Sequence, residues 1–323
     1  MELKDIKKPI NQHLKEFEKV FKKAIKSNVP LLNIIMQYII KGKGKQMRPA
    51  IVIYSAGLFN NINKSTYRGA TLIELLHTAT LVHDDVVDSS YQRRGMFSIN
   101  ALWRNKIAVL AGDFLLSRGL LVALESKDYP LLEIVSRAVK DMSEGELLQI
   151  EKARKLDISE EIYYEIIRQK TASLLASCFA VGAASAGCNN QTVETMRLAG
   201  ENLGMAFQIK DDLLDFGDSA TTGKPTGIDI KEKKMTLPVI YLLNKSDKKN
   251  KKRIITVIKK YNNDKQKISN LIDEVHQSGG IEYATGKMNE FKNKALNLLE
   301  TMPDNESKTM LKEIIFYTID REK

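Results

Sequence analysis

LIELLHTATLVHDDVVDSSYQRR, residues 72–94, begins as an apolar helical pattern and ends in charged residues. Three carboxylates, those of Asp84, Asp85 and Asp88, stand where further core residues would be expected. Residues four apart share a face of an α-helix, so Asp84 and Asp88 point the same way, with Asp85 close by. Like charges at this spacing repel each other. The stretch therefore predicts either a solvated acidic turn or a site that binds a cation.

A divalent cation would relieve this repulsion. Mg²⁺ binds one or two carboxylates and completes its octahedron with water and phosphate oxygens. Arg93 and Arg94 close the stretch with forked donors that suit phosphate. Burying the carboxylates unpaired would be costly. The flanking residues are too apolar for a solvated helix, which favours the cation site: they include Leu75, Leu76, Ala79, Val82, Val86 and Val87.

The same acidic spacing occurs a second time, in NLGMAFQIKDDLLDFGD, residues 202–218. Here Asp211, Asp212 and Asp215 again follow an apolar helical run. A single such triad is a weak signal, but two in the same context indicate carboxylates that face each other across a cavity. Such a cavity would hold several Mg²⁺ ions against a diphosphate.

Further motifs accompany the two triads in a fixed order. GKQMRP precedes the first triad at residues 44–49, and GKPTGIDIKEKKMTLP follows the second at residues 223–238. Together the motifs resemble those of the trans-isoprenyl diphosphate synthases of the long-chain polyprenyl type, octaprenyl- or heptaprenyl-like, over nearly the whole chain. The resemblance implies an isoprenoid synthase fold, a helical bundle around a central active-site cavity. The apolar periodicity independently predicts an all-α protein, and no linker divides residues 1–323, so we expect one polyprenyl synthase domain.

The resemblance also implies the residues of the active site. The catalytic residues would be Lys170, Thr171 and Gln208 together with the metal ligands Asp84, Asp85, Asp88, Asp211, Asp212 and Asp215. The substrate-binding residues would be Lys45, Arg48, His77, Arg93, Arg94, Lys170, Thr171, Gln208, Lys224 and Lys234. A plain surface loop is an equally open alternative for Lys224. The chain departs from the family's usual glycines at Lys43 and Lys233.

The implied enzyme is a Mg²⁺-dependent prenyltransferase. It would condense an allylic diphosphate, expected to be farnesyl diphosphate, with successive isopentenyl diphosphates into a long all-trans polyprenyl diphosphate for a quinone side chain. Lys170 would meet the allylic diphosphate, and Thr171 and Gln208 would lie near the developing carbocation. The alternative is a synthase of the same family with a shorter product, geranylgeranyl or farnesyl diphosphate.

Product length is predicted from the helix that leads to the first triad. The growing tail needs an apolar duct, and the residues five, eight and eleven before Asp84 are Ala79, Leu76 and Ile73. Short-product members of the family tend to have an aromatic residue at the first of these positions. Because Ala79 and Thr80 are small, we expect a long product.

Composition limits the remaining possibilities. The net charge of +10 would suit a nucleic-acid partner, but no nucleic-acid motif or aromatic interleaving accompanies it, so we expect none. The two cysteines have no metal spacing and, with a charged N-terminus, favour a cytoplasmic chain. The uncharged segment 171–193 is rich in small polar residues and predicts a buried helix rather than a membrane span. The family implies a homodimer, to which residues 98–124 would contribute, and transient membrane contact could aid product release.

Other functional classes fit the motifs less well. A terpene cyclase shares the first triad but usually has a different second motif and lacks GKQMRP. Head-to-head synthases carry DxxxD motifs instead. A non-catalytic subunit of a heteromeric synthase would lack the acidic triads, whereas both triads are complete here.

Overall fold

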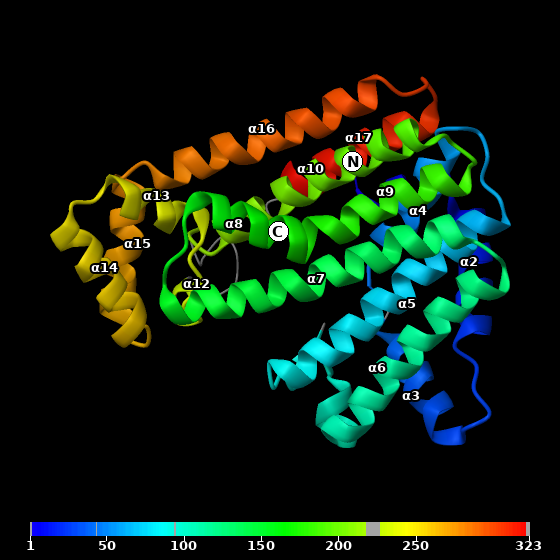
Figure 1. Cartoon of the computed structure of the whole chain (residues 1–323), viewed down its shortest axis with the longest axis horizontal. Helices are drawn as coiled ribbons and strands as arrows, with labels where there is room; N and C mark the ends of the chain where they lie inside the picture. Colours follow the sequence, from blue (N-terminus) through cyan, green and yellow to red (C-terminus); the bar gives the residue numbers. More distant parts are fainter. Residues whose placement is uncertain (1, 43, 94, 218–226, 321–323) are drawn as a thin grey trace. The chain divides into compact units, whose positions relative to one another are not determined.

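The computed structural model describes residues 2–42, 44–93, 95–217 and 227–320 (Figure 1). Almost all secondary structure in these residues is helical, which confirms the all-α prediction. The exception is an antiparallel pair of two-residue strands, β1 (Gln92–Arg93) and β2 (Met96–Phe97), that follows the first triad. The sequence analysis found no strand, because two residues are too short to show an alternating pattern.

The helices follow one another with short connections. In chain order they are α1 (Leu3–Lys7), α2 (Asn11–Ala24), α3 (Pro30–Lys41), α4 (Met47–Gly57), α5 (Lys64–Val87), α6 (Ile99–Glu125), α7 (Tyr129–Lys155), α8 (Glu160–Ile167), the π-helical turn η1 (Arg168–Ala172), α9 (Ser173–Ser185), α10 (Asn190–Leu214), α12 (Ile228–Lys231), α13 (Leu237–Lys245), α14 (Lys248–Lys260), α15 (Lys265–Gln277), α16 (Gly280–Glu300) and α17 (Glu306–Asp320).

The chain divides into two compact units. Unit 1 comprises Met1–Val139, Ser177–Arg197 and Leu299–Ile314, and unit 2 comprises Lys140–Ala176, Leu198–Leu298 and Ile315–Lys323. Five helices, α7, α9, α10, α16 and α17, carry residues of both units. The single domain over residues 1–323 stays a prediction.

Unit 1 is built around α5, the helix that carries the first triad. The side chain of its N-cap residue, Asn63, accepts hydrogen bonds from the backbone N–H groups of Ser65 and Thr66, which fixes where the helix begins. Its apolar face packs against α6, where Ala108 and Ala111 join Ala79 in one hydrophobic cluster. Small residues on α6 allow the two helices to approach closely.

Helix α6 is more exposed than a core helix. The backbone of Arg104 is not helical (φ 69°, ψ 164°), so two helical segments meet there. By length and composition α6 could cross a bilayer. Of its most apolar window, 33% is buried. Core helices of globular proteins pass the same test, so length and composition alone do not show that α6 spans a membrane.

The buried helix predicted over residues 171–193 is only partly correct. Helix α9 ends at Ser185, and Gly187 adopts a left-handed conformation (φ 84°) that closes it before α10 begins at Asn190. The Cys188 N–H donates to the carbonyl of Ala183, as in a glycine-terminated helix.

Unit 2 contains the second triad at the end of α10. Helices α8, α13 and α16 are joined by polar and aromatic contacts: the Tyr283 hydroxyl donates to Glu160 at 2.7 Å and its ring stacks on Tyr241. The C-terminal region continues the all-α pattern as α14 to α17.

Candidate active site

The first aspartate motif lies where α5 ends. Asp84 and Asp85 belong to its last turn and Asp88 is its C-cap residue. Asp85 is buried, and its carboxylate accepts a hydrogen bond from Arg93 Nε at 2.7 Å. Asp88 is exposed. Arg94 lies outside the described residues, so the structure places one of the two predicted arginines, Arg93, directly on the motif.

The predicted isopentenyl diphosphate residues lie on two helices of unit 1. Lys45 is exposed just before α4, and the left-handed Gln46 (φ 51°) begins that helix. Arg48, in its first turn, has a buried Nε with no hydrogen-bond partner among the described residues. An unpaired buried donor is costly, which fits a guanidinium arranged to receive an anion. His77 is buried on α5, and Thr80 donates to its carbonyl.

His83, the histidine directly before the first triad, packs over Gly112 of α6. A Cβ at Gly112 would lie only 2.2 Å from the His83 ring, and His83 Nε2 lies 3.2 Å from the carbonyl of Val109. This close packing supports a structural role for His83.

The predicted product-length residues form part of the core of unit 1. Ile73, Leu76 and Ala79 are 0–2% exposed, and Thr80 is half-buried. Leu76 faces Gly119 of α6, where a Cβ would lie 3.2 Å from Leu76 Cδ2. The helix pair therefore provides a buried apolar wall in which large residues, Ile73 and Leu76, stand beside the small Ala79 and Gly119.

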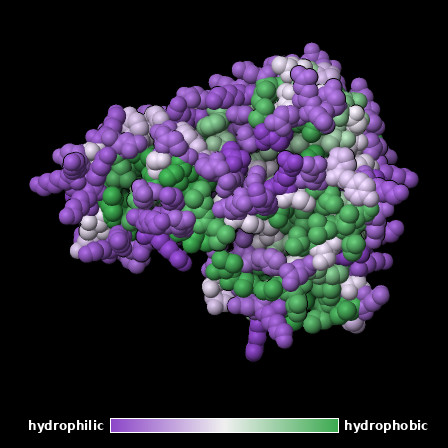
Figure 2. Space-filling model, viewed as in Figure 1, coloured by the Kyte–Doolittle hydropathy of each residue, from purple (hydrophilic) through white to green (hydrophobic). Residues whose placement is uncertain are grey.

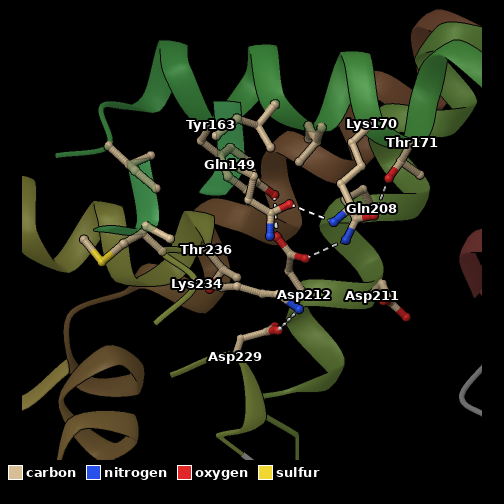
Figure 3. A pocket seen from close by; sticks show the side chains of 15 residues that line it. Gln149, Tyr163, Lys170, Thr171, Gln208, Asp211, Asp212, Asp229, Lys234 and Thr236 are labelled. Carbon is tan, nitrogen blue, oxygen red and sulfur yellow. Dashed lines mark hydrogen bonds and ion pairs between the residues drawn. The ribbon is translucent and has the colours of Figure 1, made fainter. Parts of the chain in front are cut away.

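The second aspartate motif is held by a hydrogen-bonded chain in unit 2 (Figure 3). Asp212 is buried and accepts from the Tyr163 hydroxyl at 2.7 Å and from Gln208 Nε2 at 2.9 Å. Thr171 Oγ1 donates to Gln208 Oε1 at 2.8 Å. Since an ionised carboxylate only accepts, the Gln208 amide group must face Asp212 and its carbonyl must face Thr171. The Thr171 oxygen thereby keeps lone pairs available for a cationic ligand.

Burial controls the ionisation of this motif. It raises the pKa of Asp212 to about 7, although the Gln208 and Tyr163 hydrogen bonds oppose the shift. Asp229 has a pKa raised to about 6, first by burial and then by the charge of Asp215. A metal ion would favour the ionised forms and thus compete with protons here.

Asp215 has a backbone role. Its two carboxylate oxygens accept the N–H groups of Ile228 and Asp229 at 2.9 and 3.1 Å, so it caps α12. Burial raises its pKa. Asp211 is exposed at the same helix end. Within this triad, Asp211 is therefore the carboxylate most open to a metal. Asp212 and Asp215 instead accept hydrogen bonds from neighbouring side chains and backbone.

A cavity of ≈ 270 Å³ in unit 2 brings together several of the predicted residues. Lys170, Thr171, Gln208, Asp211, Asp212 and Lys234 line it. Lys170 Nζ contacts Glu146 at 2.5 Å and donates to Gln149 at 3.0 Å. Lys234 pairs with Glu232 at 2.5 Å and lies 3.9 Å from Asp229. Lys224 lies outside the described residues.

Three of the polar residues that line the cavity were not predicted from the sequence: Tyr163, Asp229 and Thr236. Thr236 is buried, and its Oγ1 has no hydrogen-bond partner among the described residues. Gln149 also lines the cavity. A usable signal for Tyr163 was its position seven residues before Lys170, two helical turns away on the same face.

The donor chemistry of the motifs fits Mg²⁺. The described residues contain no group of three or more His, Cys, Asp or Glu side chains close enough to hold a metal. Mg²⁺ nevertheless needs only one or two carboxylates besides water and phosphate oxygens. Asp84 and Asp88 in the first motif, and Asp211 in the second, offer such oxygens.

Comparison with known proteins shows the family to which the chain is related. A family model described as polyprenyl synthetase matches residues 29–275. The octaprenyl diphosphate synthase of Escherichia coli K12 is 33% identical over 300 residues, which is 93% of each chain. Component 2 of the heptaprenyl diphosphate synthase of Geobacillus stearothermophilus is 31% identical, over 98% of each chain. The crystal structure of a Caulobacter crescentus polyprenyl synthase, complexed with calcium and isoprenyl diphosphate, superposes with a TM-score of 0.88 at 30% identity, over 100% of this chain and 98% of that one.

Proposed function

The chain belongs to the polyprenyl synthetase family, and from this premise we propose that it condenses an allylic diphosphate with successive isopentenyl diphosphates. It is a trans-prenyltransferase of the long-chain type. Farnesyl diphosphate is the primer we expect, and a quinone side chain is the expected destination of the product. The observation that carries the proposal is the pair of complete aspartate motifs on helix ends, in a chain similar along its length to long-chain synthases.

The reaction begins when the allylic diphosphate leaves. Bound Mg²⁺ would supply electrostatic stabilisation of the charge that develops on the departing diphosphate. Asp84, Asp88 and Asp211 would hold the ions, and Asp85, Asp212 and Asp215 would keep these positions fixed through their own hydrogen bonds. Arg93 and Lys170 would bind the diphosphate.

The protein then guides the allylic cation to the second substrate. Lys45, Arg48 and His77 would hold isopentenyl diphosphate, whose double bond attacks the cation. The Thr171 oxygen, oriented by Gln208, would stabilise the positive charge. The new cation loses a proton to the departed diphosphate, so this step requires no protein base.

Product length would be set along α5. Each added isoprene unit contributes five carbons, worth about 4 kcal/mol at roughly 0.8 kcal/mol per buried carbon, so an apolar path stabilises elongation. The buried wall formed by Ile73, Leu76 and Ala79 supports a path along this helix.

We propose that the protein acts in the cytoplasm as a homodimer and that α6 provides the interface. Large apolar residues on this helix are 39–55% exposed: Leu102, Val109, Leu110, Leu121 and Leu124. An exposed apolar stripe of this kind marks a contact surface. The Geobacillus relative is named as a component, so the competing outcome is a heteromer. Light scattering of the wild type and of Leu110→Asp tests this: we expect a dimer that the substitution dissociates, and a wild-type monomer would contradict it.

Transient membrane contact is also part of the proposal. A hollow of ≈ 910 Å³ in unit 1 lies between α2, α3 and α6. Figure 2 shows hydrophobic side chains gathered over α3 and α6 in this part of the surface. The hollow combines apolar walls with basic side chains, which suits an anionic amphiphile; these residues are Ile25, Met36, Ile40, Phe114, Lys22, Lys26, Lys41 and Arg118.

Vesicle flotation tests the membrane contact. Vesicles containing phosphatidylglycerol should carry the protein upward, and pure phosphatidylcholine vesicles should not. Lys26→Glu with Lys41→Glu should abolish flotation, whereas Lys259→Glu on α14 should not. Equal flotation of all variants would contradict a contact at this hollow.

The activity is tested with farnesyl diphosphate, isopentenyl diphosphate and Mg²⁺, followed by sizing of the product. We expect a polyprenyl chain longer than C20 and its loss on addition of EDTA. Products that stop at C15 or C20 would favour the shorter-product alternative. Full activity in EDTA would overturn the metal assignment.

A further inference from the structure

The helix that carries Lys170 and Thr171 contains one π-helical turn. Between α8 and α9, residues Arg168–Ala172 form η1, and the N–H of Ser173 donates to the carbonyl of Arg168, five residues back. A π-turn corresponds to one residue more than the α-helix accommodates, is rare, and is frequently found at functional sites. Lys170 and Thr171 stand at its centre.

Two glycines from other helices lie directly against this turn. A Cβ at Gly145 of α7 would be 2.7 Å from the Lys170 backbone nitrogen and 2.8 Å from Gln169 Cβ. A Cβ at Gly204 of α10 would be 2.4 Å from Ala172 Cα. Real Cβ contacts are essentially never under 3.0 Å. Only glycine therefore allows α7 and α10 to pack against the turn in this way.

Each glycine is followed, four residues later, by the glutamine that receives a side chain of the turn. Gly145 precedes Gln149, which accepts from Lys170 Nζ at 3.0 Å. Gly204 precedes Gln208, which accepts from Thr171 Oγ1 at 2.8 Å. Residues four apart share a helix face. In each Gly-x-x-x-Gln segment the glycine therefore leaves room for the backbone of the π-turn, and the glutamine offers a polar group to a side chain of the turn.

We propose that the two Gly-x-x-x-Gln segments, 145–149 and 204–208, clamp the π-turn and aim Lys170 and Thr171 into the cavity. The inference rests on the proposed prenyltransferase function. Gly145 and Gly204 are positioning residues, because they touch the turn and no substrate. Gln208 also donates to Asp212 four residues on, so the clamp couples the position of Thr171 to the second aspartate motif.

Deleting Gln169 tests whether the extra residue serves catalysis. The deletion removes the inserted residue, so the segment can return to α-helical hydrogen bonding while Lys170 and Thr171 remain. We expect a melting temperature equal to or above that of the wild type, with kcat reduced about 100-fold. KM for the allylic substrate should rise, and KM for isopentenyl diphosphate should stay unchanged. A variant that keeps its turnover, or that melts well below the wild type, overturns the proposal.

Substitutions of the two glycines provide a second test of the proposal. Gly145→Ala and Gly204→Ala should lower kcat at least tenfold with the same split between the two KM values. Gly286→Ala is the matched control, since a Cβ on this exposed glycine of α16 meets nothing within 4 Å. Unchanged kcat in both clamp variants would overturn the proposal. An inactive wild type would instead refute the proposed function, so the two failures are distinguishable.

Discussion

The two aspartate motifs have the same spacing but different surroundings. In the first, Asp85 alone is buried, paired with the neighbouring Arg93, and Asp88 is exposed at the helix end. In the second, Asp212 and Asp215 each accept two hydrogen bonds. The Asp85 carboxylate is thus paired with a residue eight positions away, whereas the buried Asp212 of the second motif is tied to Tyr163, 49 positions away. The same DDxxD spacing therefore occurs in two different settings, and in the second a buried aspartate accepts a hydrogen bond from a residue 49 positions away in the sequence.

The largest effect is expected from the first aspartate of each motif. Asp84→Ala and Asp211→Ala should each reduce kcat about 1,000-fold or more, because metal stabilisation of the leaving diphosphate is worth several kcal/mol, at about 1.4 kcal/mol per tenfold in rate. Steady-state kinetics with circular dichroism would measure this, with the exposed Asp273→Ala on α15 as control. If either variant keeps its rate, the two motifs do not share the chemistry.

The next prediction separates the motifs by product length. Ala79 and Ala206 both lie five residues before their triads, and both are buried, at 2% and 0% exposure. Ala79→Tyr should shorten the product because the ring fills the path along α5. Ala206→Tyr should lower the melting temperature by overpacking, which typically costs about 1–3 kcal/mol, and leave product length unchanged.

Chromatographic sizing of the products measures this effect, and Ala79→Leu provides a milder step. An unchanged product in Ala79→Tyr would show that the tail takes another path. A shorter product in Ala206→Tyr as well would remove the distinction between the motifs.

Local patterns explain what the sequence could predict. The two triads and the helical periodicity that predicts an all-α protein depend on residues within two turns of each other. The partners of the second motif do not. Tyr163 lies 49 residues from Asp212, and nothing in periodicity pairs them. The π-turn was also missed, because one extra residue in an apolar segment barely changes its pattern.

A third prediction tests whether the Tyr163 hydroxyl positions Asp212 in the second motif. Tyr163→Phe removes a donor from the buried Asp212, and an unsatisfied buried acceptor costs about 1–3 kcal/mol. If this free-energy cost also raises the activation barrier, kcat falls about tenfold, at about 1.4 kcal/mol per tenfold. Tyr164→Phe is the control, since that hydroxyl donates to Glu160 and not to the motif. Equal rates for both variants would mean that the Tyr163 hydroxyl does not position Asp212.

The smallest effect concerns stability without metal. Burial raises the pKa of Asp212 from 3.8 to about 7, so between these values the folded state binds the proton that the unfolded state has lost. Stability contributed by this group is therefore highest below pH 3.8 and declines as pH rises to about 7. At pH 8 with EDTA, Asp212→Asn should remove the buried charge and raise the melting temperature by several degrees, while abolishing most activity.

Asp85→Asn provides the matched test in the first motif. This substitution loses the ion pair with Arg93, so the melting temperature should stay the same or fall. Thermal unfolding from pH 4 to 8 measures both variants, and the advantage of Asp212→Asn should vanish toward pH 4. If the melting temperatures of the two variants changed with pH in the same way, the proposed difference between the motifs would be contradicted. Burial of the Asp212 charge would then destabilise the protein no more than burial of the paired Asp85 charge.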